Sequence, residues 1–394
     1  MGSSIKNRGN KRSKQGSSFY DDKTEKTCEP LIESAILPPI EPKKLIKEEI
    51  LIMTETNEFD FINDTDVQEE KLSSLLPDNQ AISSINVGFC AFGGGGGKVL
   101  KSFIDLGFNK AILFNSTAKD KPADVPDRHL VVFPNSDGLG KNVENGRKLF
   151  KDNSALIEDT LRTKIGKVEL LCVICCGGGG SGSSTGAIKD IFERYMKSNG
   201  GGQVLYIVST PTNQENLNNT VKNNSDALLK DLEGETIVVI DNERQTSILR
   251  GKVGISGLYP KANESFAKLF WQLLKLSCEK SDLSVCDSED LKKFLEAKGR
   301  IFLGSSTNQP DDKLGVNIFQ KCIDTSPCPA PKNKSNKGIL LQVIGEEASN
   351  DPAVSEHLNA SVAYTGARCD TLFTGVYVRK GLNGIVSILG FSGL

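Results

Sequence analysis

The sequence contains no long apolar run, and this absence excludes a membrane-spanning protein. None of its apolar stretches reaches the roughly 18 residues that a membrane helix requires. The first residues are polar and basic, so no secretory signal opens the chain. The chain has 394 residues, 38% hydrophobic and 25% charged, which is more than one hydrophobic core usually holds. We therefore expect a soluble cytoplasmic protein with two packed domains, some unpacked sequence and no membrane partner.

Histidine is scarce, which excludes two common kinds of site. His129 and His357 are the only two histidines, and they lie in distant, unrelated contexts. They offer little material for a His-based zinc site or a Ser/His/Asp triad, and we expect no metal site built from protein ligands alone. The formal net charge of −2 is also small. It gives no overall electrostatic reason to bind nucleic acid or an anionic bilayer.

The ten cysteines are scattered along the chain and do not suggest a disulfide framework. Cys172 and Cys175 have the spacing of a metal or redox pair. They lie, however, in the apolar run LLCVICC, where cysteine acts as a small hydrophobic residue. We interpret this run as a buried strand.

Residues 1–84 are rich in Lys, Ser, Asn, Glu and Asp, with few aromatics and no sustained periodicity. This composition predicts a mostly disordered extension. Its start is basic and the next stretch is acidic, so a tether for DNA or for a partner is one hypothesis, although a solvated tail is favoured. A short amphipathic piece around Leu45–Met53 is a second hypothesis, as a partner-binding helix.

From Ile85 onward, short apolar runs alternate with segments of helical periodicity. The runs are INVGFCAF, KAILF, HLVVF, VELLCVICC, QVLYIVS and TIVVI. Strands that alternate with helices and are apolar throughout indicate a parallel sheet covered on both faces. Residues 85–256 therefore predict a doubly wound α/β domain of the nucleotide-binding type.

A broad apolar stripe follows Tyr259 and predicts a helix buried on much of its circumference. Its apolar positions are Ala262, Phe266, Leu269, Phe270, Leu273, Leu274 and Leu276. Beyond it, RIFLG, GILLQVIG, TLFTGVYVR and GIVSILGF read as strands of a second, smaller α/β layer. We assign residues 257–285 to a central core helix and residues 286–394 to a C-terminal α/β domain.

Two glycine-rich clusters each follow a strand and precede a helix. Glycine lets backbone amides approach phosphate oxygens, and the next helix adds the positive end of its dipole. Two such clusters on one parallel sheet can share one nucleotide in the crevice at the strand ends. The expected phosphate contacts are Gly94, Gly95, Gly96, Gly97 and Lys98 in the first cluster, and Gly178, Gly179, Gly180, Ser181, Gly182 and Ser183 in the second.

Neither of the two common nucleotide motifs fits these clusters. A Rossmann site expects an acidic residue about 20 residues after its glycines, and that region reads LFNSTAKD, which is ambiguous. A Walker loop ends in Gly-Lys-Ser/Thr, whereas the first cluster ends in Gly-Lys-Val-Leu. The second cluster is therefore the one that discriminates between families.

The second cluster, GGGGSGSST, resembles the glycine-rich signature of the tubulin/FtsZ superfamily, and the resemblance extends over about residues 85–394. Ser181 replaces the usual Thr, and Ser184 replaces the usual last Gly. The segment GLGKNVENGR resembles a shortened loop that senses the third phosphate, which implies contacts from Gly138, Leu139 and Gly140.

The resemblance implies a nucleoside site further along the chain. Glu215 stands where the family binds the ribose, whereas Asn219 stands where FtsZ usually has an arginine. Asn242 and Asn263 stand where the family reads the guanine edge, and Tyr259 is placed to stack on the base. An amide presents a donor and an acceptor, and a Tyr ring adds stacking. The implied ligands are GTP and GDP, with Mg²⁺ accompanying the nucleotide.

The segment from Asp287 to Phe294 resembles the catalytic loop of FtsZ, whose two acids reach the nucleotide of the next subunit. Asp287 and Asp290 match those acids, and Val285 replaces the preceding Asn of the family. An N-cap with acidic first-turn residues on an ordinary helix is the alternative interpretation. If the resemblance holds, the site is complete only between two molecules, and head-to-tail contact propagates into a filament.

The resemblance implies a divergent prokaryotic or phage tubulin that polymerises and hydrolyses GTP. The chain stops near the expected final strand, with no acidic tail or adaptor peptide, which favours positioning or segregation of DNA over cell division. Partners would then include a DNA-binding adaptor, in the host cytoplasm if a phage encodes the protein. A non-hydrolysing filament scaffold, an FtsZ-like division protein and a dinucleotide-dependent oxidoreductase are the alternatives.

Overall fold

The computed structural model describes residues 83–123, 125–308, 316–382 and 384–394. These residues all fall in the second of the two units into which the chain divides, Thr56–Leu394. The expected N-terminal extension lies outside the described residues except for its last two positions. The hypotheses on its basic start and on Leu45–Met53 also lie outside them.

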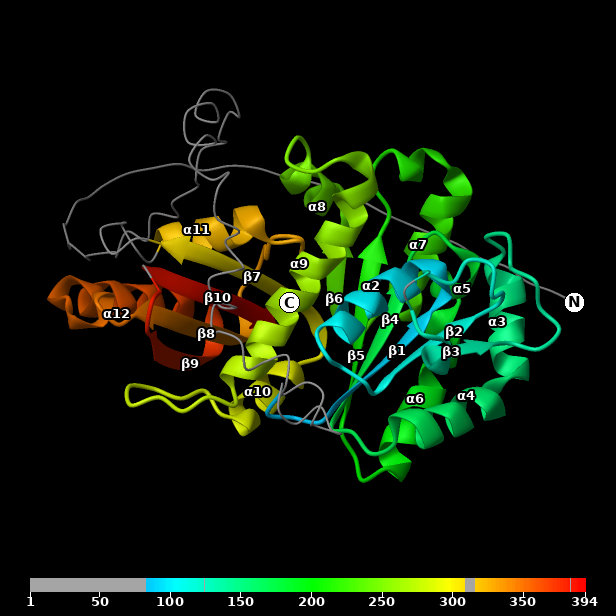
Figure 1. Ribbon diagram of the computed structural model, residues 1–394, viewed down its shortest axis with the longest axis horizontal. Helices are drawn as coiled ribbons and strands as arrows, with labels where there is room; N and C mark the ends of the chain where they lie inside the picture. Colours follow the sequence, from blue (N-terminus) through cyan, green and yellow to red (C-terminus); the bar gives the residue numbers. More distant parts are fainter. Residues whose placement is uncertain (1–82, 124, 309–315, 383) are drawn as a thin grey trace, which may run out of the picture. The chain divides into compact units, whose positions relative to one another are not determined.

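The described strands form one ten-stranded sheet in the order β3-β2-β1-β4-β5-β6-β7-β10-β8-β9 (Figure 1). Every apolar run that the sequence assigns to a strand forms one. The strands are β1 (Val87–Phe92), β2 (Ala111–Asn115), β3 (Leu130–Val132), β4 (Leu170–Cys176), β5 (Gln203–Thr210), β6 (Thr236–Asp241), β7 (Gly299–Asn308), β8 (Ser335–Gly345), β9 (Cys369–Arg379) and β10 (Ile385–Ser392).

The first six strands pair only in parallel, as their continuous apolar runs predict. In the second part, β10 pairs antiparallel with β7 and β8, and β8 pairs in parallel with β9. The chain order 3-2-1-4-5-6 along the first part reverses between β1 and β4. The expected doubly wound α/β class, with a smaller α/β part after it, is confirmed.

Helices connect the strands, and most of them lie between consecutive parallel strands. They are α2 (Gly93–Asp105), α3 (Val143–Asp152), α4 (Ser154–Thr160), α5 (Gly180–Ser183), α6 (Lys189–Ser198), α7 (Asn219–Asp231), α8 (Asn242–Leu249), α9 (Ile255–Leu276), α10 (Ser288–Leu295), α11 (Val316–Thr325) and α12 (Pro352–Gly366). Short single-turn helices cover Asp127–His129, Leu161–Ile165, Thr185–Ile188, Glu215–Leu217 and Ala348–Asn350.

Two hydrophobic clusters lie on the two faces of the sheet, because successive side chains of a strand point to opposite faces. Phe89 belongs to the cluster that also contains the buried side of α9, and Phe92 belongs to the other. Cys172 and Cys175 are three positions apart on β4 and fall in different clusters. They point to opposite faces and do not form a pair, in agreement with their interpretation as small hydrophobic residues of a buried strand.

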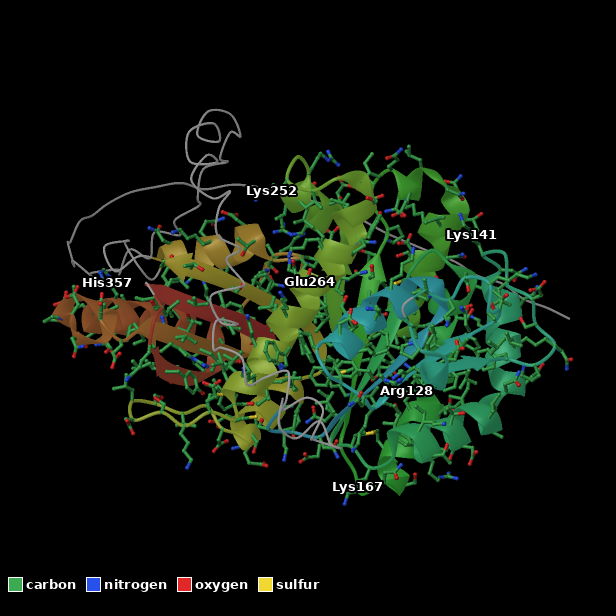
Figure 2. The ribbon with its side chains drawn as sticks, viewed as in Figure 1. Arg128, Lys141, Lys167, Lys252, Glu264 and His357 are labelled. Atoms are coloured by element: carbon green, nitrogen blue, oxygen red, sulfur yellow. The ribbon has the colours of Figure 1, made fainter. Side chains whose placement is uncertain are left out.

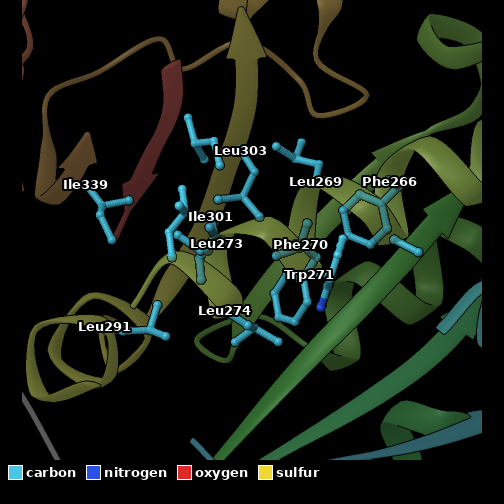
Figure 3. Packing of buried hydrophobic residues seen from close by; sticks show 14 of the residues in the cluster. Phe266, Leu269, Phe270, Trp271, Leu273, Leu274, Leu291, Ile301, Leu303 and Ile339 are labelled. Atoms are coloured by element: carbon cyan, nitrogen blue, oxygen red, sulfur yellow. The ribbon is translucent and has the colours of Figure 1, made fainter. Parts of the chain in front are cut away.

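The central helix α9 joins the two parts of the sheet. Its buried side chains lie beside strand residues of the second part and beside α10 (Figure 3). The labelled residues are Phe266, Leu269, Phe270, Trp271, Leu273, Leu274, Leu291, Ile301, Leu303 and Ile339. Burial of each such side chain stabilises the fold by about 1.5–3 kcal/mol. The helix begins at Ile255, before the apolar stripe, and includes Pro260.

The two predicted domains share this sheet. Strand β6, from the nucleotide-binding part, pairs in parallel with β7 through Thr236↔Gly299, Ile237↔Arg300 and Val238↔Ile301. The pairing of β6 with β7 covers only three positions, whereas β10 and β7 pair over eight. The division into domains at residues 256 and 286 stays a prediction.

Candidate functional site

A cavity of about 700 Å³ opens where β1, β4, β5 and β6 end. Parallel strands bring their carboxyl ends to one edge of the sheet, so the residues that follow them meet there. Those residues are the two glycine clusters, the turn after Pro211 and the start of α8. The N-terminal turns of α9 close the same cavity through Tyr259 and Asn263.

The first glycine cluster forms the start of a helix rather than a separate loop. Helix α2 begins at Gly93, directly after β1, and Gly93 adopts φ +77, a conformation that favours glycine. No side chain caps this end and its first turn carries no acid. The first backbone N–H groups of a helix lack intrahelical partners, so this end presents donors and a positive dipole end beside the cavity.

The helical start separates the expected phosphate contacts of this cluster into two groups. Gly94, Gly95 and Lys98 line the cavity. Gly96 and Gly97 do not line it: a Cβ at Gly96 would lie 3.0 Å from the Ile174 carbonyl oxygen, and one at Gly97 would lie 2.8 Å from a Leu113 methyl. These two glycines let α2 pack closely on the sheet. Lys98 is exposed and forms no ion pair within the described part of the chain.

The second glycine cluster wraps the cavity from β4 to α5. Gly178, Gly179, Gly180, Ser181 and Gly182 all line it, and Gly178 adopts φ +96. A Cβ at Gly182 would overlap the carbonyl oxygen of Cys176, so only glycine lets the loop lie this close to its strand. Ser183 is fully buried and does not line the cavity. Its hydroxyl accepts a hydrogen bond from the Gly178 N–H at 3.0 Å and braces the loop from behind.

Ser184, the serine at the usual last glycine, is also accounted for by the structure. Its hydroxyl lies 2.7 Å from the Gly180 carbonyl oxygen and 2.8 Å from that of Val143. A Cβ at Gly146 would overlap the Ser184 hydroxyl, so α3 and this turn pack closely. The serine therefore connects the second glycine cluster to α3, the helix that follows the expected third-phosphate loop.

The expected third-phosphate loop lies beside the second glycine cluster. Four of its residues line the cavity: Gly138, Leu139, Gly140 and Lys141. A Cβ added at Gly180 would lie 2.7 Å from the Leu139 Cβ, so the loop and the glycine cluster pack closely. The Asn224 amide donates to the Lys141 carbonyl oxygen at 2.8 Å and fixes the end of the loop. Figure 2 shows Lys141 at this end of the strands and Lys167 at the opposite end.

Glu215 lines the cavity at the turn after β5. Its Oε2 accepts hydrogen bonds from the Thr212 backbone N–H at 2.8 Å and from the Thr212 hydroxyl at 3.0 Å. Its Oε1 has no partner in the described residues and remains available to accept from a ligand hydroxyl. Asn219 does not line the cavity, whereas its neighbour Asn218, which caps α7, does.

The side chains of Asn242, Asn263 and Tyr259 line the part of the cavity that is formed by α8 and α9. Asn242 is the first residue of α8, and the Asp241 side chain caps that helix. Asn263 is 8% exposed, and its side chain has no hydrogen-bond partner within the described ranges. Tyr259 is 36% exposed. Burial raises the pKa of Tyr259, and the nearby Glu215 and Glu243 add to the shift, so the phenol is neutral at physiological pH.

No protein-family model matches the sequence, and no curated protein matches it. Solved structures do match it, and those that match share one architecture. Among solved structures, TubZ of Bacillus thuringiensis in a GTPγS-form protofilament matches with a TM-score of 0.64 at 17% identity, covering 83% of this chain and 92% of that one. CetZ2 of Haloferax volcanii, a GTPγS-bound protofilament, gives 0.63 at 16%, covering 78% and 92%. The M. jannaschii FtsZ dimer gives 0.58 at 18%, covering 83% and 92%.

The chain has the tubulin/FtsZ fold. The expectation drawn from GGGGSGSST is therefore confirmed at the level of the fold, which is what similarity at these identities shows. Among the described helices of this tubulin/FtsZ fold, none is both long and apolar enough to cross a membrane.

Several residues that line the cavity of this tubulin/FtsZ fold were not expected from the sequence. They include Gly93, Ser116, Asp120, Lys141, Cys176, Ser209, Gln214, Asn218 and Val221. Asp120 is the one acid among them. Its carboxylate oxygen would lie 3.2 Å from a Cβ at Gly94, and the Asn115 amide donates to it. Asp120 ends the sequence segment LFNSTAKD, which starts in β2 and continues into the turn after it, but only the fold brings this acid beside the first glycine cluster.

Asp287 and Asp290, the expected catalytic acids, do not line the cavity. Asp287 caps α10 by accepting from the N–H groups of Glu289 and Asp290, at 2.8 and 3.0 Å. The alternative N-cap interpretation is thus realised in the structure. Helix α9 separates the acids from the cavity, and its 22 residues span about 33 Å at 1.5 Å per residue. In Figure 1, α8 and α10 lie at opposite ends of α9.

Proposed function

We propose that this chain binds a guanine nucleotide, assembles head-to-tail and hydrolyses GTP where two copies meet. One observation carries this proposal. A single cavity gathers two glycine clusters, the Glu215 carboxylate and two amides, while the acids lie beyond the other end of α9. Each part has an ordinary structural explanation alone, but their convergence on one cavity has the layout of a nucleotide site.

The phosphate end of the cavity fits a triphosphate. Helix α2 presents its uncapped N-terminus there, the second glycine cluster adds backbone close to the cavity, and Lys98 adds a cation. A substituent at Gly182 would collide with Cys176, so the second glycine cluster can lie this close to β4 only because residue 182 is glycine. These are the donors that phosphate oxygens require.

Mg²⁺ fits the same end of the site. Asp120 lines it beside Gly94, and Mg²⁺ in such sites is held by one or two carboxylates together with substrate phosphates. When bound, the ion would neutralise part of the charge of the phosphates. The part of Asp120 would be to hold that ion, with the Asn115 amide orienting its carboxylate.

The base end of the cavity fits guanine. Asn242 and Asn263 offer amide donors and acceptors, and the neutral ring of Tyr259 offers a stacking surface. The free Oε1 of Glu215 suits a ribose hydroxyl, because an ionised carboxylate only accepts hydrogen bonds.

Hydrolysis would be completed by a second copy. We assign Asp287 and Asp290 the role of positioning or activating the attacking water at the nucleotide of the neighbouring subunit. No single copy brings these acids to its own cavity, so the contact that does so is heterologous. A heterologous contact that does not close into a ring propagates as a filament.

Exposed apolar side chains support contact between copies, both beside the cavity and beside the segment that carries Asp287. Leu217 and Ile255 are 83% and 93% exposed on elements that adjoin the cavity. Leu283 and Val285 are 61% and 45% exposed on the segment that leads to Asp287. Burying such residues against a second copy is favourable, and the two pairs lie near opposite ends of α9.

The proposed cellular role is to position or segregate DNA in the cytoplasm, with a DNA-binding adaptor as partner. It rests on the sequence resemblance to plasmid and phage tubulins. A filament that binds GTP without hydrolysing it is the second candidate, and Val285 in place of the family's Asn favours it. Co-sedimentation of the filaments with DNA, with and without the N-terminal extension, tests the role in DNA binding.

The experiment that tests the biochemical proposal combines nucleotide binding with sedimentation. The purified full chain is titrated with GTP, GDP, ATP and NAD, and is then pelleted with GTP and with a non-hydrolysable analogue while phosphate release is followed. We expect GTP-dependent pelleting and phosphate release. Pelleting without release would favour the non-hydrolysing filament, and binding of NAD alone would overturn the proposal.

A further inference from the structure

We propose that Ser209 orients the Asn242 amide and thereby makes the cavity select oxopurine over aminopurine nucleotides. The inference rests on the proposed nucleotide site and concerns how that site chooses its base. Ser209 was not among the residues expected from the sequence, and it lines the cavity together with Asn242.

The two residues meet because they come from neighbouring strands. Ser209 lies on β5 opposite Ile240 of β6, and Asn242 follows the end of β6. The Ser209 hydroxyl donates to the Asn242 Oδ1 at 2.8 Å. The backbone on both sides is fixed, since the Ser209 carbonyl oxygen accepts from the Gly177 N–H at 2.8 Å and Asp241 caps α8.

This hydrogen bond decides which end of the amide faces a ligand. With Oδ1 occupied by Ser209, the Nδ2 group is the part of the Asn242 side chain that has no partner in the described residues. Asn242 then turns its N–H donors toward the cavity, because its side-chain oxygen is directed at the Ser209 hydroxyl. Asn263 differs, because its side-chain oxygen and nitrogen both lack partners among the described residues.

A fixed donor distinguishes two classes of purine. Guanine carries a carbonyl acceptor at position 6, where adenine carries an amino group that is itself a donor. Two donors that face each other without an acceptor leave buried polar groups unpaired, and such mismatches give strong discrimination. Without Ser209 the amide can turn over, so its oxygen can face an amino group.

The test measures the ratio of affinities for GTP and ATP in the full-length wild type and in Ser209→Ala, with Ser209→Thr as the matched variant that keeps the hydroxyl. We expect Ser209→Ala to weaken GTP binding about fivefold and to lower the GTP/ATP ratio by about tenfold or more. Ser209→Thr should keep the wild-type ratio. Inosine triphosphate, which keeps the carbonyl at position 6, should follow GTP in every variant.

A further variant separates orientation from a general loss of structure. Asn242→Asp has no N–H to present, so adding Ser209→Ala to it should leave the GTP/ATP ratio unchanged. An unchanged ratio in Ser209→Ala, or equal weakening of both nucleotides, would overturn the inference and leave the proposed function standing. A wild type that binds no guanine nucleotide would overturn the proposed function itself.

Discussion

The Lys292 ammonium lies 2.8 Å from a carboxylate oxygen of Glu169, and this ion pair joins α10 to the start of β4. The Lys292 carbonyl oxygen also accepts from the amide of Gln203, which begins β5. Burial would raise the pKa of Glu169, but hydrogen bonds from Lys292 and from the Asn86 N–H lower it overall, so the pair stays ionised at neutral pH. Helix α10 is therefore held at the edge where the parallel strands begin, opposite the cavity.

The position of α10 leads to the first prediction. Asp290→Ala should bind GTP and assemble like the wild type but lose about 10²-fold of its turnover, the usual scale for a positioned acid or base. Glu296→Ala, an exposed acid just after the same helix, is the matched control and should keep full turnover. Steady-state phosphate release per filament mass is the measurement. Equal rates for the two variants would remove Asp290 from the reaction.

The second prediction concerns the cation at the phosphate end. Lys98→Gln should weaken GTP binding by about tenfold, because a charge-assisted hydrogen bond is lost. Lys101→Gln, three residues along α2, is the control, since Lys101 pairs with Asp105 and does not line the cavity. Equilibrium binding of GTP to both variants is the measurement. Similar losses for the two would show that general charge, and not contact with the nucleotide, sets the affinity.

The third prediction concerns the close approach of the second glycine cluster to β4. Gly182→Ala should lower the free energy of unfolding by about 1–3 kcal/mol, because its Cβ would overlap the Cys176 carbonyl oxygen. It should weaken GTP binding as well. Gly254→Ala is the control, since no atom lies within 4 Å of its Cβ position and it does not line the cavity. Chemical denaturation and GTP titration measure the two effects, and a fully stable Gly182→Ala would contradict the predicted overlap.

The fourth prediction uses the raised pKa of the cavity thiol. With a pKa of about 11, only about 0.1% of Cys176 is thiolate at about pH 8, and the fraction rises tenfold per pH unit above that. Iodoacetamide should therefore leave Cys176 unmodified at neutral pH and label it only in strong alkali. Cys278, the exposed cysteine among the described residues, should react first. Mass spectrometry of labelled peptides gives the order, and rapid labelling of Cys176 at neutral pH would contradict the raised pKa of this thiol.

The fifth prediction concerns the apolar contact between copies. Leu283→Asp should raise the protein concentration needed for assembly by about tenfold or more, because a charge would be buried against the next copy. GTP binding should be unchanged. Leu156→Asp is the control, since Leu156 is an exposed apolar residue on α4, 37% exposed, and α4 contributes no residue to the cavity. Sedimentation across a concentration series is the measurement, and equal effects at both positions would argue against a specific contact at Leu283.

The strands and the central helix were predictable because their signals are local. An apolar run such as VGFCAF can be satisfied only by burial on both faces, and the stripe around Phe266 repeats at the helical period. The sequence also indicated that the ends of such strands would hold the site. The turn at Glu215 and the start of α8 at Asn242 follow directly from those strand ends.

The finer placement was not predictable, because it depends on where each helix starts and how neighbouring strands are registered. Helix α2 starts at Gly93, so its rotation turns Gly96 and Gly97 toward the sheet. Ser209 reaches Asn242 only through the register of β5 and β6. The position of Asp290 beyond the far end of α9 likewise depends on packing between distant segments.

The measurement that tests the account most directly is phosphate release per molecule as a function of protein concentration. If the acids of one copy complete the cavity of another, turnover per molecule should be negligible below a threshold concentration and should rise steeply above it, together with pelletable filament. A turnover per molecule that is the same at every concentration would place the whole reaction within one copy and contradict the account.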